Sequence, residues 1–226
     1  FICDTLSAMD HKSIAPFLDL ANHHPNATFA DIEDICAKVK TYGFNAVFVN
    51  PYFVPFARQK MGTGKVGTVV SFPLGQETLD IKLASTRAGA LAGATELDVS
   101  LNVGQIKSAS WDELLTEMRQ IVSAVKNIDQ QKIVKFILET GYLTDDEIKQ
   151  ASILVLRSGA DFVKTNSGMG PRGATIADVE LIKKATDGKI KIKAAGGIDT
   201  YEEAAALIKA GASRIGTSKA VEIVTS

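Results

Sequence analysis

Lys164 has a distinctive chemical setting, because it ends an apolar run and precedes a polar one. Phe162 and Val163 come directly before it, and hydroxyl, amide and glycine residues follow as Thr165-Asn166-Ser167-Gly168. Such a flexible polar segment suits the wrapping of a polar ligand. A lysine at the end of a buried strand is either a surface cation that extends past the strand or an amine nucleophile that forms a Schiff base.

Other polar or functional residues also stand where apolar runs end. These positions are Asp19, Asn50, Phe72, Asp98 with Ser100, Glu139, Lys164, Lys193 and Gly216. Three acids and two lysines at strand ends are a poor arrangement if stability were the only requirement. The set therefore indicates a polar site built from several strand ends.

A glycine-rich pair of segments follows Lys193. Ala194-Ala195-Gly196-Gly197-Ile198 comes first, and Arg214-Ile215-Gly216-Thr217-Ser218 comes one strand–helix unit later. Adjacent glycines let backbone N–H groups approach an anion, and Thr217-Ser218 open a helix whose N-terminus favours negative charge. We expect phosphate at Gly196, Gly197, Gly216, Thr217 and Ser218, with Gly168 nearby and Arg172 or Lys219 as an added cation.

Metal and nicotinamide chemistry are not indicated. The three histidines, His11, His23 and His24, all lie within the first 24 residues, whereas a catalytic metal needs ligands that converge from several strands. The interpretation we prefer for His23-His24 is that they shape the first loop. No Gly-x-Gly-x-x-Gly fingerprint follows a strand. We therefore expect no metal and no cofactor.

Short β-rich runs alternate with longer helical ones along the chain. The expected strands are Ile14–Leu20, Phe44–Val49, Lys65–Phe72, Glu96–Leu101, Ile133–Leu138, Phe162–Lys164, Ile190–Ala194 and Arg214–Gly216. The expected helices are Thr28–Thr41, a short stretch to Met61, Glu77–Ala92, Trp111–Lys126, Thr144–Ser158, Thr175–Thr186, Thr200–Ala210 and Ser218–Val224. Apolar periodicity and threonine caps carry these assignments.

Eight strand–helix units predict an α/β fold, a single-domain (β/α)₈ TIM barrel over residues 1–226, in which a short segment of about residues 1–12 precedes the first strand. Gly-Ala pairs before several strands support a repeated unit, although a doubly wound open sheet would also use them. In a barrel the strands' carboxyl ends form the active site.

Strand alternation adds a second expectation about charge. Asp98 shares a face with Glu96, Glu139 with Lys135, and Lys193 with Lys191. If the strand tips point inward, these partners form a lower charged layer inside the barrel. The alternative is that Lys135 and Lys191 point outward.

Composition narrows the functional class. The 226 residues carry a net charge of −1 and are 46% hydrophobic, so neither nucleic acid nor a membrane is an expected partner. The two cysteines, Cys3 and Cys36, have no metal-site or disulfide-scaffold spacing. We expect a cytoplasmic protein. The sequence leaves its oligomeric state, including a homo-oligomer, open.

Several of these motifs resemble the deoxyribose-phosphate aldolase family. They are Asn50-Pro51, Ser71-Phe72-Pro73-Leu74-Gly75, Glu96-Leu97-Asp98-Val99, Glu139-Thr140-Gly141, Asp161-Phe162-Val163-Lys164-Thr165, Lys193-Ala194-Ala195-Gly196-Gly197 and Arg214-Ile215-Gly216-Thr217-Ser218. The resemblance runs in order from about Leu18 to Ser218. The chain departs from the family pattern at Ala21, Phe48, Met169, Arg172 and Lys219.

The resemblance implies a class I aldolase that interconverts 2-deoxy-D-ribose 5-phosphate with D-glyceraldehyde 3-phosphate and acetaldehyde. It implies that Lys164 forms the Schiff base, that Lys193 is the second lysine and that Asp98 transfers protons. The small-molecule partners would be a phosphosugar and aldehydes. The alternatives are another Schiff-base barrel aldolase acting on a phosphosugar and a phosphosugar-binding barrel without aldol chemistry.

Overall fold

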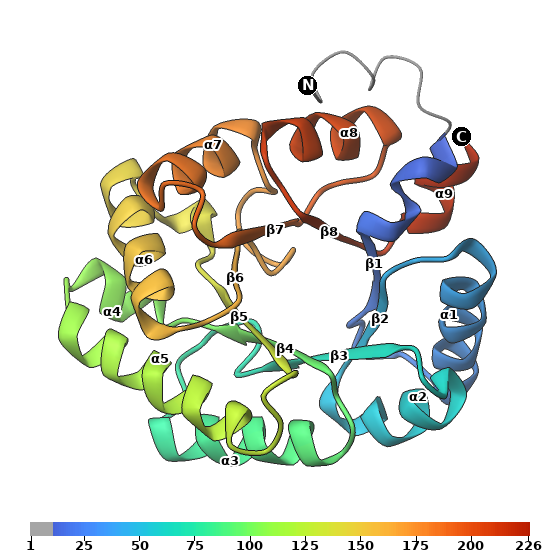
Figure 1. Ribbon diagram of the computed structural model, residues 1–226, viewed down its shortest axis with the longest axis horizontal. Coiled ribbons are helices and arrows are strands. Elements are labelled where there is room, and N and C mark those ends of the chain that lie inside the picture. The colour runs from blue at the N-terminus through green and yellow to red at the C-terminus, as the bar shows by residue number, and fades with distance from the viewer. Residues whose placement is uncertain (1–10) are drawn as a thin grey trace.

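A closed barrel of eight parallel strands organises the part of the chain that the computed structural model describes, residues 11–226 (Figure 1). The strands are β1 (Leu18–Asn22), β2 (Ala46–Val49), β3 (Lys65–Val70), β4 (Glu96–Ser100), β5 (Ile133–Ile137), β6 (Phe162–Lys164), β7 (Lys191–Ala195) and β8 (Arg214–Thr217). Each strand pairs with its neighbour in sequence, and β1 closes the barrel by pairing with β8. This is the predicted (β/α)₈ TIM barrel.

A ring of helices surrounds the strands (Figure 1). The α-helices are α1 (Phe29–Tyr42), α2 (Val54–Met61), α3 (Leu79–Leu91), α4 (Val103–Lys107), α5 (Trp111–Lys126), α6 (Asp145–Ser158), α7 (Ile176–Ala185), α8 (Tyr201–Ala210) and α9 (Ala220–Thr225). Short 3₁₀ helices η2 (His11–Phe17), η3 (Pro51–Phe53) and η4 (Thr140–Tyr142) complete the described elements. None of the helices in this part of the chain is long and apolar enough to cross a membrane.

Local sequence explains where several helices begin. The threonines that precede them accept the N3 backbone N–H, and an acid at N3 accepts the cap's own N–H, at Thr28, Thr144, Thr175 and Thr200. This reciprocal capping satisfies donors that a helix start leaves free. The helices α1 and α6 end at Gly43 and Gly159, which adopt the left-handed conformation.

Two different interiors result from strand alternation. Outward side chains such as Val47, Val99 and Phe136 pack against the helices in one continuous apolar core. Inward positions carry charge and aromatic rings instead, including the fully buried Asp98 and Lys135. The buried, charged barrel interior is thus distinct from the core that joins the barrel to its helices.

Several details of the expected elements differ from the structure. The strand expected from Ile14 begins at Leu18, and the preceding residues form η2; Pro16 has no N–H for a strand ladder, which favours this outcome. The short helices α4 and η4 were not expected, and the last helix begins at Ala220 rather than Ser218. Residues 1–10 of the expected N-terminal segment, with Cys3, lie outside the described residues.

Candidate active site

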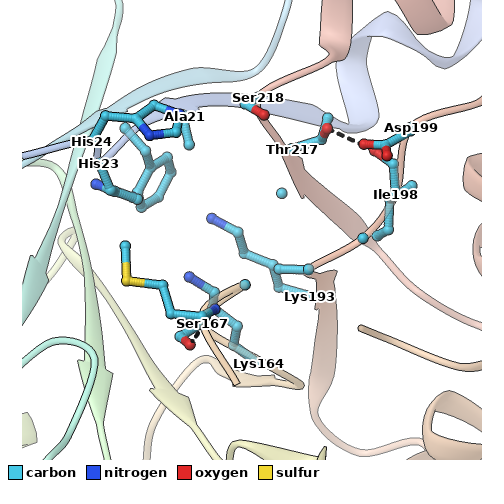
Figure 2. A pocket seen from close by; sticks show the side chains of 17 residues that line it. Ala21, His23, His24, Lys164, Ser167, Lys193, Ile198, Asp199, Thr217 and Ser218 are labelled. Atoms are coloured by element: carbon cyan, nitrogen blue, oxygen red, sulfur yellow. Dashed lines mark hydrogen bonds between the residues drawn. The ribbon is translucent and has the colours of Figure 1, made fainter. Parts of the chain in front are cut away.

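Lys164 lies at the carboxyl end of β6, beside a cavity of about 180 Å³ (Figure 2). Its side chain is 4% exposed, and it extends into the cavity next to Lys193 from the neighbouring strand. The register pairs the two lysines directly. The sequence-predicted lysines are therefore brought together at the mouth of the barrel.

Asp98, the central residue of β4, contacts three lysines. Its Oδ2 accepts hydrogen bonds from Lys164 Nζ at 2.9 Å and Lys193 Nζ at 3.0 Å, and its Oδ1 accepts from Lys135 Nζ at 3.0 Å. Burial would raise the pKa of Asp98, but Lys135, Lys164 and Lys193 together hold it well below its usual range. Asp98 is therefore a carboxylate at neutral pH.

The pKa of Lys164, which determines how reactive its amine is, results from opposing influences. Burial, the largest of them, lowers its pKa, and the nearby cation Lys193 lowers it further, whereas the carboxylate of Asp98 raises it. The resulting pKa is about 8, compared with the ordinary 10.5. A lysine with this pKa is partly neutral near pH 7 and can act as a nucleophile.

Lys193 has a different environment from that of Lys164. Besides Asp98 it pairs with Asp19 Oδ2 at 2.7 Å, and its Nζ lies 3.4 Å from the centroid of the Phe48 ring. Two carboxylates and one aromatic face therefore contact Lys193 Nζ, whereas Lys164 Nζ contacts a single carboxylate.

Two of the three residues expected in a lower charged layer, Glu96 and Lys135, are buried inside the barrel. Lys135 Nζ donates to Glu96 Oε2 at 2.5 Å, and both side chains are fully enclosed. Burial lowers the pKa of Lys135, but Asp98 and Glu96 outweigh that effect and raise it. Lys191 is not enclosed with them: it is exposed, although its Nζ lies 5.7 Å from the centroid of the buried Phe162 ring, which Lys135 Nζ also faces.

All six residues predicted to hold phosphate line the cavity: Gly168, Gly196, Gly197, Gly216, Thr217 and Ser218. Gly196 and Gly197 have φ angles of 94° and 65°, and a Cβ on Gly196 would come 3.2 Å from Gly168 Cα. Only glycine permits this backbone conformation and approach without strain. Asp199 also lines the cavity as an exposed residue.

Neither of the expected added cations lies there. Arg172 forms a paired contact with both carboxylate oxygens of Asp178, and Lys219 donates to Glu222 at 3.3 Å. The cavity lining includes neither residue. The lysines that line the cavity are Lys164 and Lys193.

Glu139 does not line this cavity but supports the segment that does. It adopts a left-handed conformation with φ 58°, and its Oε2 accepts the Ser167 N–H at 3.1 Å. Asn166 accepts from Thr140 and Gly141 in the same region. These bonds fix the segment that follows Lys164, so the role of Glu139 is to position the loop.

Sequence reasoning missed His23 as a residue of this site. His23 follows β1, lines the cavity and lies 5.2 Å from Phe72, ring centroid to ring centroid. Burial and the neighbouring cations Lys164 and Lys193 lower its pKa to about 3, so the imidazole is neutral. The available signal was its place just after a strand's carboxyl end, where barrel sites form.

Metal-ligand geometry is a separate question. Among residues 11–226, no three His, Cys, Asp or Glu side chains are grouped so that they could hold a metal ion. The chemistry that the described cavity offers is that of a nucleophilic amine, a carboxylate and a fixed cation, next to a glycine-rich loop suited to an anion.

Comparison with known proteins gives one consistent result. The model of the DeoC/LacD family aldolases matches residues 5–219. Deoxyribose-phosphate aldolase of Dictyoglomus turgidum is 41% identical over 96% of this chain and 98% of its own length. That of Thermoanaerobacter sp. (strain X514) is 44% identical over 94% and 96%.

Solved structures agree with these relatives. The tetrameric deoxyribose phosphate aldolase from Aeropyrum pernix superimposes with a TM-score of 0.86 at 30% identity, covering 95% of this chain and 90% of that one. A structure described as QR15, an aldolase, has a TM-score of 0.88 at 37% identity, covering 93% and 94%.

Proposed function

The chain belongs to the DeoC/LacD family of aldolases, and on that premise we propose that it cleaves 2-deoxy-D-ribose 5-phosphate to D-glyceraldehyde 3-phosphate and acetaldehyde, reversibly. Relatives that carry the name deoxyribose-phosphate aldolase, at 41% to 44% identity over nearly their whole length, support this activity. The enzyme would be a class I aldolase, in which a lysine amine forms the covalent intermediate.

Lys164 is the proposed nucleophile. Its neutral amine attacks the sugar aldehyde at C1, and loss of water leaves an iminium. The bond between C2 and C3 then breaks, its electron pair moves toward the iminium to form an enamine, and C3 becomes the aldehyde of glyceraldehyde 3-phosphate. A pKa of about 8 supports this role, because about a tenth of such an amine is neutral at pH 7, against roughly one in 2,500 for an ordinary lysine.

Asp98 is the proposed proton-transfer group. Cleavage releases the proton of the C3 hydroxyl, and the enamine carbon C2 later takes a proton up. A carboxylate can carry both transfers through one bound water. Its contact with Lys164 Nζ at 2.9 Å supports the assignment. Lys193 would hold this carboxylate and keep a positive charge beside the nucleophile.

The glycine loops after β7 and β8 are the proposed phosphate site. Backbone N–H groups at Gly196, Gly197 and Gly216, with Thr217 and Ser218, would bind the 5-phosphate, and Gly168 would close the loop opposite. Phosphate binding there would orient C3 relative to Lys164. The position after strands seven and eight supports it, since barrels of this kind often bind phosphate there.

Three broader statements belong to the same proposal. We take residues 1–226 as one barrel domain, a homo-oligomer as the assembly and the cytoplasm as the location. The tetramer described for the Aeropyrum pernix aldolase supports an oligomer. The pairing of β1 with β8 supports a single domain, because it joins strands from near the two ends of the described chain.

The observation that carries the proposal is the buried Lys164 with its lowered pKa, bonded to Asp98. Borohydride reduction in the presence of acetaldehyde tests it directly, because borohydride fixes an imine as a stable ethyl group on the amine. We expect loss of activity and an ethyl adduct on the peptide that contains Lys164, found by mass mapping. EDTA should not change the yield, since the proposed reaction uses no metal.

The matched variant is Lys164→Arg, which keeps the charge but cannot form an imine, so activity should fall nearly to zero. An adduct on Lys193 would reverse the assignment of the nucleophile. Use of dihydroxyacetone phosphate in place of acetaldehyde as donor would indicate a different Schiff-base aldolase. An absence of any adduct or turnover would indicate a phosphosugar-binding barrel.

A further inference from the structure

Phe48 lines the catalytic cavity and faces the cations of the barrel interior, although the proposed chemistry gives it no role. It lies on β2, a strand without charged residues, and it is fully buried. Lys193 Nζ lies 3.4 Å from the centroid of its ring, and Lys135 Nζ lies 4.7 Å from the same centroid. One ring therefore faces two of the three lysines that contact Asp98.

The nucleophile Lys164 faces a different ring. Its Nζ lies 5.8 Å from the centroid of Phe72, close to the limit of about 6 Å within which a cation is attracted to an aromatic face. The 3.4 Å contact between Lys193 Nζ and the Phe48 ring is well inside that limit. The close aromatic contact therefore distinguishes the second lysine from the nucleophile.

Two glycines leave the space that the Phe48 ring and the Lys193 side chain occupy. Gly67 on β3 pairs in register with Phe48, and a Cβ on Gly67 would collide with Cζ of the ring. A Cβ on Gly216 of β8 would come 2.8 Å from Lys193 Cε. Because a larger residue at either position would displace one of the two partners, the strands on both sides fix the ring against the lysine.

We infer that Phe48 is a positioning residue, whose ring face holds the charged amine of Lys193 beside Lys164. The face of an aromatic ring is electrostatically negative, and it attracts a cation most strongly where water is excluded. Asp19 and Asp98 contact the same Nζ at 2.7 and 3.0 Å. Loss of the ring would open this side of Lys193 to the cavity, because Phe48 lines it. The inference rests on the proposed aldolase function, in which Lys193 acts beside the nucleophile.

The groups around Lys164 determine what a weaker ring would change. Burial lowers the pKa of Lys164, Asp98 raises it, and the cations Lys193 and Lys135 lower it. His23, in the loop after β1, is neutral. If the ring holds Lys193 less firmly, this cation lowers the pKa of Lys164 less, and that pKa rises. Activity, which needs the neutral amine, would then require a higher pH.

The test weakens the negative face of the ring and nearly keeps its shape. Phe48 is replaced by 4-fluoro-, 3,5-difluoro- and 3,4,5-trifluorophenylalanine, since each fluorine withdraws electron density from the ring face. We expect kcat/KM for deoxyribose 5-phosphate at pH 7 to fall with each fluorine, by about 2- to 30-fold for the trifluoro ring, the range that cation–π contacts supply. The rising limb of the pH profile, which reports neutral Lys164, should move to higher pH in the same order.

Labelling with acetic anhydride gives a second measurement that does not depend on turnover. Only a neutral amine reacts, so acetylation of the peptide that contains Lys164, followed by mass mapping at each pH, reports its titration. The midpoint should rise from about 8 as fluorines are added. Phe48→Leu, which removes the ring face altogether, should raise the midpoint at least as far as the trifluoro ring does.

The same three fluorinated residues at Phe136 form the matched control. Phe136 is also fully buried, but it belongs to the apolar core between the barrel and its helices. Fluorination there should leave both the pH profile and the labelling midpoint as they are in the unaltered protein.

Unchanged kinetics and labelling across the Phe48 series would overturn the inference and leave Phe48 as a residue that only fills the barrel interior. A loss of activity with an unchanged labelling midpoint would also overturn it, because the ring would then act through its shape alone. If the unaltered protein neither cleaves deoxyribose 5-phosphate nor forms an imine with acetaldehyde, it is the proposed function that fails, and the labelling series still decides whether Phe48 holds Lys193.

Discussion

Lys164, Lys193 and Lys135 share one carboxylate, Asp98, and yet they have different tasks. Lys135 is bonded to two carboxylates and its pKa is raised. Lys193 has Asp98 and Asp19 as partners. Lys164 has only Asp98, so burial dominates and its pKa falls to about 8. Lys164 thus has one carboxylate partner, whereas Lys135 and Lys193 have two each.

This difference predicts the pH dependence of a Lys193→Leu variant. Lys193 lowers the pKa of Lys164, so its removal should raise that pKa above about 8. Activity requires neutral Lys164, which forms as pH rises through its pKa. The alkaline-rising limb of the kcat/KM profile should therefore move to higher pH, with low activity near pH 7 and partial recovery near pH 10.

Lys191→Leu is the matched control for this profile, because Lys191 lies on the same strand but is exposed. Its profile should coincide with that of the unaltered protein. A deficit in Lys193→Leu that is the same at every pH would contradict the tuning role. It would leave Lys193 as a group that only positions Asp98 and Asp19.

The loops after β7 and β8 are the elements in which backbone, rather than side chains, would bind the ligand. Gly197 has φ 65°, and the space beside its Cα is bounded by Gly173 at 3.5 Å from an added Cβ. Thr217 fixes the second loop, since its hydroxyl donates to the Ile198 carbonyl at 2.7 Å. The two loops are therefore held together as one surface.

A Gly197→Val variant tests whether the loops after β7 and β8 bind the phosphate of the substrate. A branched side chain would crowd the N–H groups, so kcat/KM for deoxyribose 5-phosphate should fall about 10- to 100-fold, as expected from the loss of charge-assisted hydrogen bonds. The value for unphosphorylated deoxyribose should change much less. Steady-state kinetics on both sugars provides the comparison.

Gly188→Val separates crowding from backbone strain. Gly188 has the same φ of 65° but lies away from the cavity, with nothing within 4 Å of an added Cβ. It should lose stability and keep its kinetic preference for the phosphorylated sugar. Equal losses on both sugars in Gly197→Val would place the phosphate elsewhere.

At the scale of the whole molecule, the barrel interior is a buried set of charges enclosed by an apolar shell. Asp19, Glu96, Asp98, Lys135, Lys164 and Lys193 come from five different strands and are all at most 3% exposed. Such a set is stable only when its charges balance, since an unpaired buried charge is costly. Closure of the barrel is what brings the balancing charges together.

Lys135→Met should therefore destabilise the fold strongly. It leaves Glu96 without the cation that its Oε2 contacts, and we expect a loss of about 3–5 kcal/mol in the free energy of unfolding. Urea denaturation measures it. Without its cation the pKa of Glu96 would rise above its unfolded value, so the loss should shrink as pH falls and Glu96 takes up a proton.

Lys191→Met removes the same type of residue from an exposed position and should change stability by less than about 0.5 kcal/mol. Lys135→Met with Glu96→Gln should recover part of the loss, because the uncompensated carboxylate is gone. A small effect of Lys135→Met alone would mean that water or another cation reaches Glu96.

Local pattern was sufficient to predict the strand order, most helix bounds and the position of Lys164. Period-two and period-3.6 patterns and threonine caps act over a few residues, so the sequence alone carries them. Asp98 and Lys193 were also predicted as site residues, but each is the third of the five residues of its strand rather than at the strand end that was expected. Pro16, which breaks the expected first strand, was also a local signal.

What only the tertiary structure decided is which groups meet and in what state. Asp19 and Lys193 contact each other because β8 closes on β1, and His23 becomes part of the site because Phe72 and Asn50 from other loops enclose it. The inward direction of Lys135 and the lowered pKa of Lys164 depend on the same enclosure. Burial and through-space charge act between residues far apart in sequence, so no local pattern contains them.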